Sequence, residues 1–268
     1  MILFYILGKT IYNDNRKGGR RYEEENRFKK SNHNKLEFIT TTKYIEKYLK
    51  KKDKILEVGA GTGAYSLYYA KQGYDVTAVE LVEENITKLK QGIEETMNIQ
   101  VHQGNAVDLT MFEDETFDIT LVLGPMYHLF TKEEQEKAIA EAIRVTKKEG
   151  LIYFAYITND AVVLKVLLLE HKLLEYRDKH DEKFRLVNSP EQIFNLFLIK
   201  DFEEMMKDTN TVCLHEVATD GIAQAMQMYI DHLSEEEFEE WIKYHLATCE
   251  RKDLMGYSTH VLHICQKK

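Results

Sequence analysis

The chain has 268 residues, of which 44% are hydrophobic and 30% are charged, and it contains only 2 prolines. This composition excludes a disordered or fibrous protein and allows a full-sized hydrophobic core. The formal net charge of -9 argues against tight sequence-independent binding to nucleic acid, because such binding draws its energy from Lys and Arg on phosphates.

Cysteine spacing and the first residues give an expectation about the protein's environment. Cys213, Cys249 and Cys265 lie far apart and form no C-x-x-C pair, so we expect neither a disulfide framework nor a structural metal site. The apolar run 1–7 is too short to span a membrane and lacks the flanks of a signal peptide. We therefore expect a cytoplasmic protein without membrane contact, and the sequence predicts no particular oligomeric state.

Strand and helix patterns alternate along the first half of the chain. The polar segment 13–34 contains Gly18 and Gly19, and we expect it to be mobile up to about Tyr22. A helix is expected over 37–49, where apolar residues recur near helical spacing. Further helices are expected at 64–72, at 83–95 and from 131 onward, and strands at 55–58, 75–80, 99–102, 117–123 and 151–157. Alternation of this kind predicts a mostly parallel sheet covered on both faces by helices.

The regular alternation stops near Asn159, and helices are expected before a strand at 211–217. Three helix starts carry local signals: a capping box of Thr131 with Glu134, a second of Ser234 with Glu237, and the run Ser189-Pro190-Glu191-Gln192. The chain ends on a predicted strand at 259–266. We expect one domain, 1–268, with a helical lid segment (1–50), a cofactor-binding core (51–157), a helical insertion (158–210) and C-terminal strands and helices (211–268).

The strongest local motif is Glu57-Val58-Gly59-Ala60-Gly61-Thr62-Gly63, which lies where a predicted strand meets a helix. Glycine is needed there because the chain turns tightly and its backbone must approach a ligand. Read as Gly59-x-Gly61-x-x-Ala64, the loop also satisfies the dinucleotide fingerprint, so it does not separate a nicotinamide enzyme from a methyltransferase. Glu80 ends the next strand, where an acidic side chain suits the ribose diol of either cofactor.

The glycine loop, Glu80, Gly104-Asn105-Ala106 and Phe117-Asp118 together resemble the class I S-adenosylmethionine-dependent methyltransferases over about 54–157. The resemblance implies a Rossmann-like fold with a mostly parallel seven-stranded sheet and an antiparallel last strand. Asn105 stands where that family often has Asp, and its amide oxygen can make the same contact to adenine. The segment 123–129, Leu-Gly-Pro-Met-Tyr-His-Leu, and the tail 255–262 resemble one small-molecule-type branch of that family.

This resemblance implies S-adenosylmethionine as the cofactor and assigns residues to it. Gly59 and Gly61 would admit its methionine and ribose parts, Glu57 would favour its ammonium group, and Leu81 would pack on the adenine. The full set of implied cofactor residues is Glu57, Gly59, Ala60, Gly61, Gly63, Glu80, Leu81, Asn105, Ala106, Leu123 and Gly124. Methyl transfer is an in-line displacement at carbon, so we expect the protein to align the reactants and exclude water.

Tyr127 and His128 follow the fourth strand and are the candidate catalytic residues. A neutral His can take a proton from a hydroxyl or amine near pH 7, and Tyr can position the nucleophile. A purely structural role for His128 in its loop stays open. His260 and His263 are three apart on a predicted strand, so they face opposite sides and make a poor metal pair.

Three alternatives remain beside methyl transfer to a small molecule. A short-chain dehydrogenase would need Tyr-x-x-x-Lys after the glycine loop, yet the two such spacings, Tyr5/Lys9 and Tyr48/Lys52, both precede it. A nucleic-acid methyltransferase would share the fold, but the Asp/Asn-Pro-Pro-Tyr signature is absent and the charge is acidic. A non-catalytic cofactor-binding module would use the same loop without chemistry.

Overall fold

The protein is described by a computed structural model over residues 31–186 and 194–268. Within these residues one seven-stranded sheet has the order β3-β2-β1-β4-β5-β7-β6. Its strands are β1 Lys54–Val58, β2 Asp75–Glu80, β3 Ile99–Gln103, β4 Phe117–Val122, β5 Thr146–Ile157, β6 Thr211–Ala218 and β7 His260–Lys267. β7 pairs antiparallel with both β5 and β6, whereas every other pair is parallel. The predicted mostly parallel sheet with an antiparallel last strand is confirmed.

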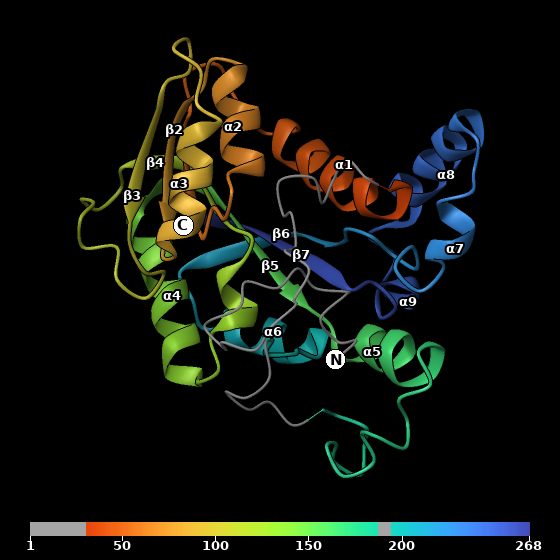
Figure 1. Ribbon diagram of the computed structural model, residues 1–268. Helices are drawn as coiled ribbons and strands as arrows, with labels where there is room; N and C mark the ends of the chain where they lie inside the picture. Colours follow the sequence, from red (N-terminus) through yellow and green to blue (C-terminus); the bar gives the residue numbers. More distant parts are fainter. Residues whose placement is uncertain (1–30, 187–193) are drawn as a thin grey trace.

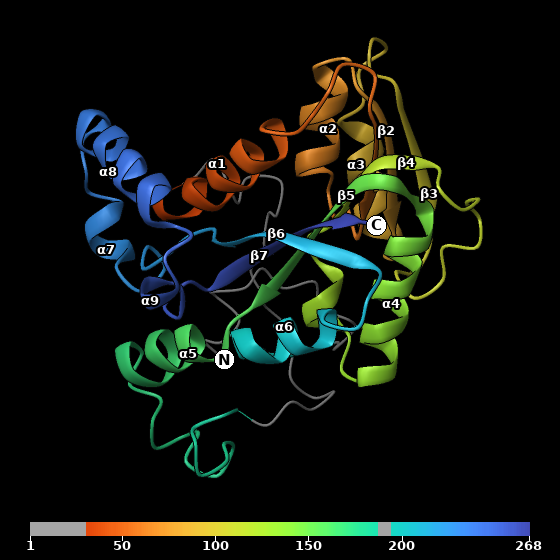
Figure 2. The ribbon, with the colours of Figure 1, turned by 180° about the vertical axis from the view of Figure 1, so that it is seen from behind.

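Helices cover the sheet on both faces (Figures 1 and 2). Helices α1 Asn32–Glu46, α2 Ala64–Lys71 and α3 Glu83–Gln91 lie on one face, and α4 Lys132–Val145 and α6 Ile199–Met206 lie on the other. Side chains of β5 alternate accordingly, since Tyr153 packs toward α1 and α2 while Phe154 packs toward α6. Apolar strands such as β1 and β4 are buried on both sides, as parallel strands require.

Both predicted capping boxes are present. The Thr131 side chain accepts a hydrogen bond from the Glu134 backbone N–H at the start of α4, and the Glu134 carboxylate accepts one from the Thr131 backbone N–H. Ser234 and Glu237 do the same for α8 Glu235–Thr248. These reciprocal bonds satisfy N–H groups that the helix leaves without partners.

Several predicted boundaries were wrong, and two of the elements are extended by contacts with residues distant in the sequence. α1 begins at Asn32 rather than Glu37, because its polar first turn binds Asp231, which accepts from the His33 backbone N–H (3.0 Å). α3 ends at Gln91 rather than Glu95, where Gly92 closes it. β5 begins at Thr146 rather than Leu151, because Thr146 already pairs with Phe117 of β4 ahead of a register shift.

The predicted helical insertion is helical only in part. α5 Asn159–Val162 continues into the π-helix η4 Val163–Leu169, and α6 follows much later. The predicted start at Ser189-Pro190 lies outside the described residues, as does the predicted mobile segment up to Tyr22. Residues 194–198 are not helical, because the Phe197 backbone N–H donates to the Ile157 carbonyl oxygen (2.9 Å) and extends the chain beside β5.

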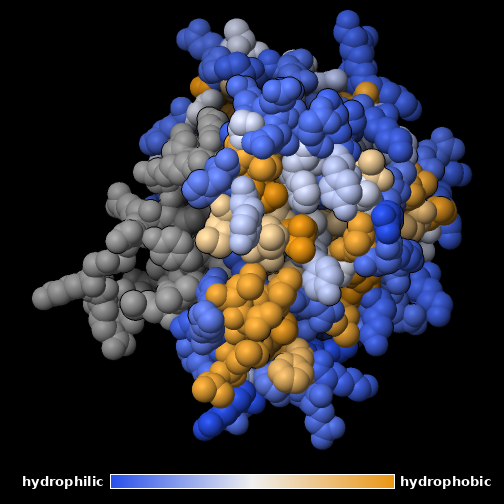
Figure 3. Space-filling model, turned by 90° about the vertical axis from the view of Figure 1, so that its right-hand side faces the viewer, coloured by the Kyte–Doolittle hydropathy of each residue, from blue (hydrophilic) through white to orange (hydrophobic). Residues whose placement is uncertain are grey.

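Between β6 and β7 the chain forms three helices, α7 Gln227–Ile230, α8, and α9 Lys252–Met255. α1 packs against α7 and α8. Hydrophobic residues gather in the lower half of the face shown in Figure 3, the side that carries α5. Leu168, Leu169 and Leu174, which belong to η4 or follow it, are exposed apolar side chains. None of the described helices combines the length and the apolar character needed to cross a membrane.

Candidate active site

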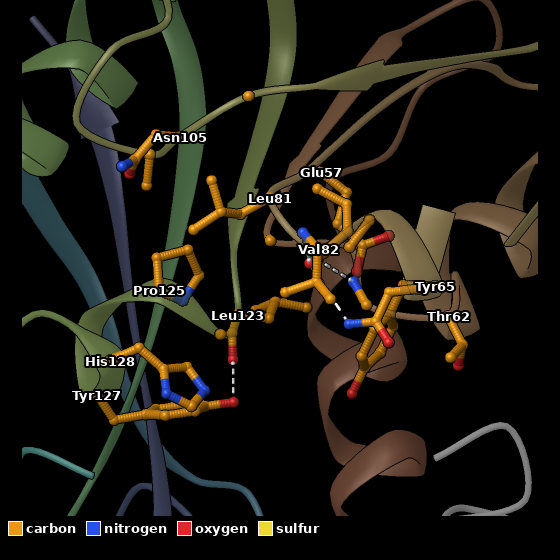
Figure 4. A pocket seen from close by; sticks show the side chains of 18 of the residues that line it. Glu57, Thr62, Tyr65, Leu81, Val82, Asn105, Leu123, Pro125, Tyr127 and His128 are labelled. Atoms are coloured by element: carbon orange, nitrogen blue, oxygen red, sulfur yellow. Dashed lines mark hydrogen bonds between the residues drawn. The ribbon is translucent and has the colours of Figure 1, made fainter. Parts of the chain in front are cut away.

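A cavity of about 450 Å³ opens where β1, β2 and β4 end (Figure 4). This is the edge at which parallel α/β sheets bind their ligands. Twelve of the thirteen site residues predicted from the sequence line it, namely Glu57, Gly59, Ala60, Gly61, Glu80, Leu81, Asn105, Ala106, Leu123, Gly124, Tyr127 and His128. Gly63 is the exception, because it caps α2 with a positive φ of 87°, and a Cβ there would lie 2.7 Å from Cγ of Leu89.

The glycine loop follows β1 and is held against β2. The backbone N–H groups of Gly59 and Ala60 both donate to the Val79 carbonyl oxygen, at 2.8 and 3.0 Å. Gly59 has φ 72°, and a Cβ on it would lie 2.8 Å from the Pro125 ring. Gly61 has φ 56°. Because only glycine adopts this backbone at little cost and leaves the space open, the loop can approach a ligand closely.

Glu80 organises the loop as well as facing the cavity. One carboxylate oxygen accepts from the Gly61 N–H (2.7 Å), and the other accepts from the Val82 N–H (2.9 Å). The side chain is only 6% exposed. Each carboxylate oxygen can accept more than one hydrogen bond, so both oxygens keep the capacity to accept hydrogen bonds from a ligand. The ribose role of Glu80 stays a prediction, whereas its hydrogen bonds to the loop backbone were missed by sequence reasoning.

Glu57 is anchored at the start of α2. One of its oxygens accepts from both the backbone N–H (2.8 Å) and the hydroxyl of Ser66. The side chain is 3% exposed. A carboxylate at a helix N-terminus is favoured by the partial positive charge of the unpaired N–H groups. Glu57 is thereby positioned to present negative charge to the cavity.

The cavity is lined by carboxylates. Glu37 and Glu134 join Glu57 and Glu80, and no lysine or arginine of the described residues lines it. A concave surface of one sign concentrates ligands of the opposite charge. Sequence reasoning missed Glu37 and Glu134, because Glu37 reaches the cavity from α1 and Glu134 gave only a helix-capping signal.

Apolar side chains form another part of the wall. Leu81 is 54% exposed although it directly follows the buried strand β2, and Figure 4 shows it near Val82, Leu123 and Pro125. An exposed leucine at a cavity rim offers a flat apolar ligand a surface to cover. Asn105 lies at the same cavity, and its amide oxygen accepts from the Val107 N–H at 3.2 Å.

Tyr127 and His128 belong to the short 3-10 helix η3 Pro125–His128 that follows β4. The Tyr127 hydroxyl donates to the Leu123 carbonyl oxygen at 3.0 Å, as Figure 4 shows. The Tyr127 ring packs edge-on against Phe194, with centroids 5.6 Å apart. The His128 ring lies 5.0 Å from the Tyr127 ring and is exposed at the cavity. Tyr127 therefore braces the loop that carries His128.

A buried polar cluster lies behind Tyr127. Nδ1 of His260 is 3.2 Å from Asp220 and 3.5 Å from Glu37, and the Ser258 hydroxyl donates to Asp220 at 2.6 Å. Although burial opposes it, hydrogen bonds from His260 and Ser258 hold the pKa of Asp220 below its usual value. His263 instead contacts Glu216, so the prediction that the two histidines face opposite sides of the sheet is confirmed.

Comparison with known proteins agrees with this geometry. Residues 55–150 match the methyltransferase domain family. The chain is 37% identical to demethylmenaquinone methyltransferase of Renibacterium salmoninarum over 103 residues, 38% of this chain and 40% of that protein. It is 23% identical to glycine/sarcosine N-methyltransferase of Aphanothece halophytica over 181 residues, 63% of this chain and 67% of that protein. The chain spans about half the length of the curated relatives it matches.

A solved structure has the same overall fold over most of the chain. The crystal structure of an S-adenosylmethionine-dependent methyltransferase from Methanosarcina mazei superposes with a TM-score of 0.56 at 19% identity, covering 84% of this chain and 96% of that one. The chain therefore has the class I methyltransferase fold. Residues 55–150 of this fold match a methyltransferase domain, and the Methanosarcina mazei protein is S-adenosylmethionine-dependent.

The residues at the cavity suit this cofactor. S-adenosylmethionine carries a sulfonium, an ammonium group, a ribose diol and an adenine, and the cavity offers carboxylates, a glycine loop and an exposed leucine. The negative lining favours the two cationic groups. Phosphates of a dinucleotide would instead meet carboxylates. The negative lining is thus complementary in charge to S-adenosylmethionine, a preference that the glycine loop alone did not establish.

We expect Glu80→Ala to weaken S-adenosylmethionine binding by about 1 to 3 kcal/mol, the range for hydrogen bonds to a charged group. The loss combines the ribose contact with the acceptor for the Gly61 and Val82 N–H groups. Titration calorimetry of parent and variant measures it. Glu83→Ala is the control, because Glu83 follows the same strand in the first turn of α3 but does not line the cavity. Equal affinities for the parent and Glu80→Ala would refute the ribose assignment.

Proposed function

We propose that the chain transfers the methyl group of S-adenosylmethionine to a small-molecule acceptor by in-line displacement. The observation that supports this proposal is that the cavity with the predicted cofactor residues is also lined by Tyr127, His128 and Leu129. Its volume of about 450 Å³ falls in the range of small-ligand sites. The same cavity thus brings the predicted cofactor residues and the candidate catalytic residues together.

When bound, S-adenosylmethionine supplies a methyl group activated by its positively charged sulfur. The chain's own residues orient the acceptor and exclude water, which is the main protein contribution to such a displacement. We assign His128 as the base that takes the acceptor's proton. Tyr127 keeps His128 in place through the hydrogen bond from its hydroxyl to the Leu123 carbonyl oxygen, and its oxygen can still accept one from the acceptor.

Charge supports a small acceptor over a nucleic acid. The lining glutamates would repel phosphates, and the chain's net charge of -9 adds to that repulsion. Glycine/sarcosine N-methyltransferase, one of the relatives, is named for small amino-acid acceptors. This likeness covers 63% of the chain and supports the same class of acceptor here.

Incubation with methyl-labelled S-adenosylmethionine tests the proposal against its alternatives. The protein would be incubated in parallel with a small-metabolite extract and with total RNA, and the label followed by mass spectrometry. We expect label in a metabolite, and about 100-fold less of it when His128→Asn protein replaces the parent at the same concentration and at an early time point. Label in RNA alone would establish a nucleic-acid methyltransferase. Tight cofactor binding without label in either extract would leave the non-catalytic binding module as the function.

A further inference from the structure

A second cluster of ligating side chains lies on the opposite face of the sheet from α1, away from the cavity. Cys213 and Glu216 come from the edge strand β6, and His263 comes from its neighbour β7. Their ligating atoms all lie within 4.8 Å of one another. None of the three lines the cofactor cavity.

A β-bulge brings Cys213 and Glu216 onto the same face. Residues three apart on a regular strand point to opposite sides of the sheet. The register with β7 shifts between Cys213 and His215, and both Leu214 and His215 pack toward α1. The extra residue therefore turns Cys213 and Glu216 together toward α6, where His263 also lies. Bulges that re-aim side chains in this way are frequent beside functional sites.

The distances suit a single ion. Nδ1 of His263 is 2.7 Å from a Glu216 oxygen and 3.9 Å from the Cys213 sulfur, and that sulfur is 4.0 Å from the Glu216 oxygen. Tetrahedral zinc with ordinary bond lengths separates such ligand atoms by about 3.3 to 3.6 Å, so each pair needs to move by less than about 0.7 Å. No backbone rearrangement is required for shifts of that size.

The surroundings already orient two of the three ligands. The second Glu216 oxygen accepts from the Tyr156 hydroxyl at 2.7 Å, and the Tyr156 ring stacks on Phe202 with centroids 4.3 Å apart. The His263 side chain is 3% exposed and its ring packs against Phe202. Hydrogen-bonded and packed ligands of this kind are typical of metal sites, because they fix the ligand before the ion arrives.

An ion can reach the cluster from solvent on the side of the Cys213 thiol. Cys213 is exposed, and a cavity of about 490 Å³ reaches Cys213, Glu216 and His263 from solvent. A thiolate, an imidazole and a carboxylate form the donor set that zinc prefers, and three protein ligands leave a fourth position for water.

We propose that Cys213, Glu216 and His263 bind one Zn²⁺ ion. The ion would replace the proton between His263 Nδ1 and Glu216, and both this proton and that of the Cys213 thiol would be released to solvent. The site clamps the edge strand β6 to β7, so zinc should stabilise the fold. It is independent of the methyl-transfer site.

Metal titration of the untagged, reduced protein tests this proposal. We expect one Zn²⁺ per chain by calorimetry, and Co²⁺ should give the charge-transfer absorption of a thiolate ligand. Cys213→Ser should abolish that absorption and weaken zinc binding by about 100-fold or more. Loss of a residue that only hydrogen-bonds to a metal ligand already lowers metal affinity by about 10 to 100-fold. Cys213 is exposed, so this variant should fold.

His263→Gln should have the same effect as Cys213→Ser, whereas His232→Gln serves as the matched control, because His232 is exposed and lies outside the cluster. The melting temperature of the parent should rise with zinc, and that of Cys213→Ser should not. Absence of stoichiometric zinc binding would overturn the proposal. So would equal affinity in parent and Cys213→Ser, which would locate the ion elsewhere. S-adenosylmethionine affinity, measured on the same samples, reports separately on the methyltransferase site.

Discussion

Gly61→Val is expected to abolish the thermal stabilisation that S-adenosylmethionine gives the parent protein. At about 100 times its dissociation constant a ligand adds about 2.7 kcal/mol to stability, which raises the Tm of a chain of this size by about 5 °C or more. Gly61 lines the cavity with φ 56°, and its N–H donates to Glu80. A branched side chain there occupies the ligand's space and strains the loop.

Gly73→Val is the matched control for backbone strain. Gly73 also has a positive φ, 87°, but a Cβ on it would meet nothing within 4 Å, and it lies outside the cavity. Both variants should lose stability without ligand, by about 1 to 3 kcal/mol, while only Gly61→Val should lose the response to S-adenosylmethionine. NAD should stabilise neither the parent nor the variants. A parent that responds to NAD and not to S-adenosylmethionine, or a folded Gly61→Val variant with unchanged affinity, would show that the site is misplaced.

His128→Asn is expected to lower turnover by about 100-fold or more while leaving cofactor affinity nearly intact. A general base usually increases the rate of the reaction by a factor of about 10² to 10⁴. Asparagine keeps a polar side chain of similar reach without the basic nitrogen. His128 is exposed at the cavity beside the Tyr127 and Phe194 rings. Steady-state kinetics on the acceptor found by the labelling experiment measures kcat, and calorimetry measures cofactor binding.

Tyr127→Phe separates catalysis from loop bracing. It removes the hydrogen bond to the Leu123 carbonyl oxygen and should cost about 1 kcal/mol of stability, raise KM or lower kcat, and leave cofactor affinity unchanged. If His128 also serves only to brace the loop, His128→Asn will weaken cofactor binding and lower the Tm together. Undiminished kcat in His128→Asn would exclude the base role and leave catalysis to positioning.

The elements that the sequence predicted correctly are stabilised by residues close to one another in the chain. The apolar strands, the two capping boxes and the glycine loop each depend on neighbours in the sequence. The predicted ends of helices and strands were wrong where residues distant in the sequence contact the element. Asp231 extends α1 to Asn32, and the pairing of Thr146 with Phe117 of β4 extends β5 beyond the predicted strand. Helix and strand ends carry little energy of their own, so a few tertiary hydrogen bonds move them.

The sequence by itself determined the parallel sheet, the glycine loop and the edge at which the ligand site lies, because side-chain periodicity and glycine's backbone freedom are local properties. Only the tertiary structure decided which distant groups meet. α1 carries Glu37 to the cavity wall, β7 inserts so that His260 meets Asp220, and the bulge in β6 turns Cys213 and Glu216 toward His263. Spacing rules for metal ligands miss this last cluster, because they assume neighbours in sequence, whereas pairing of two strands sets the contact here.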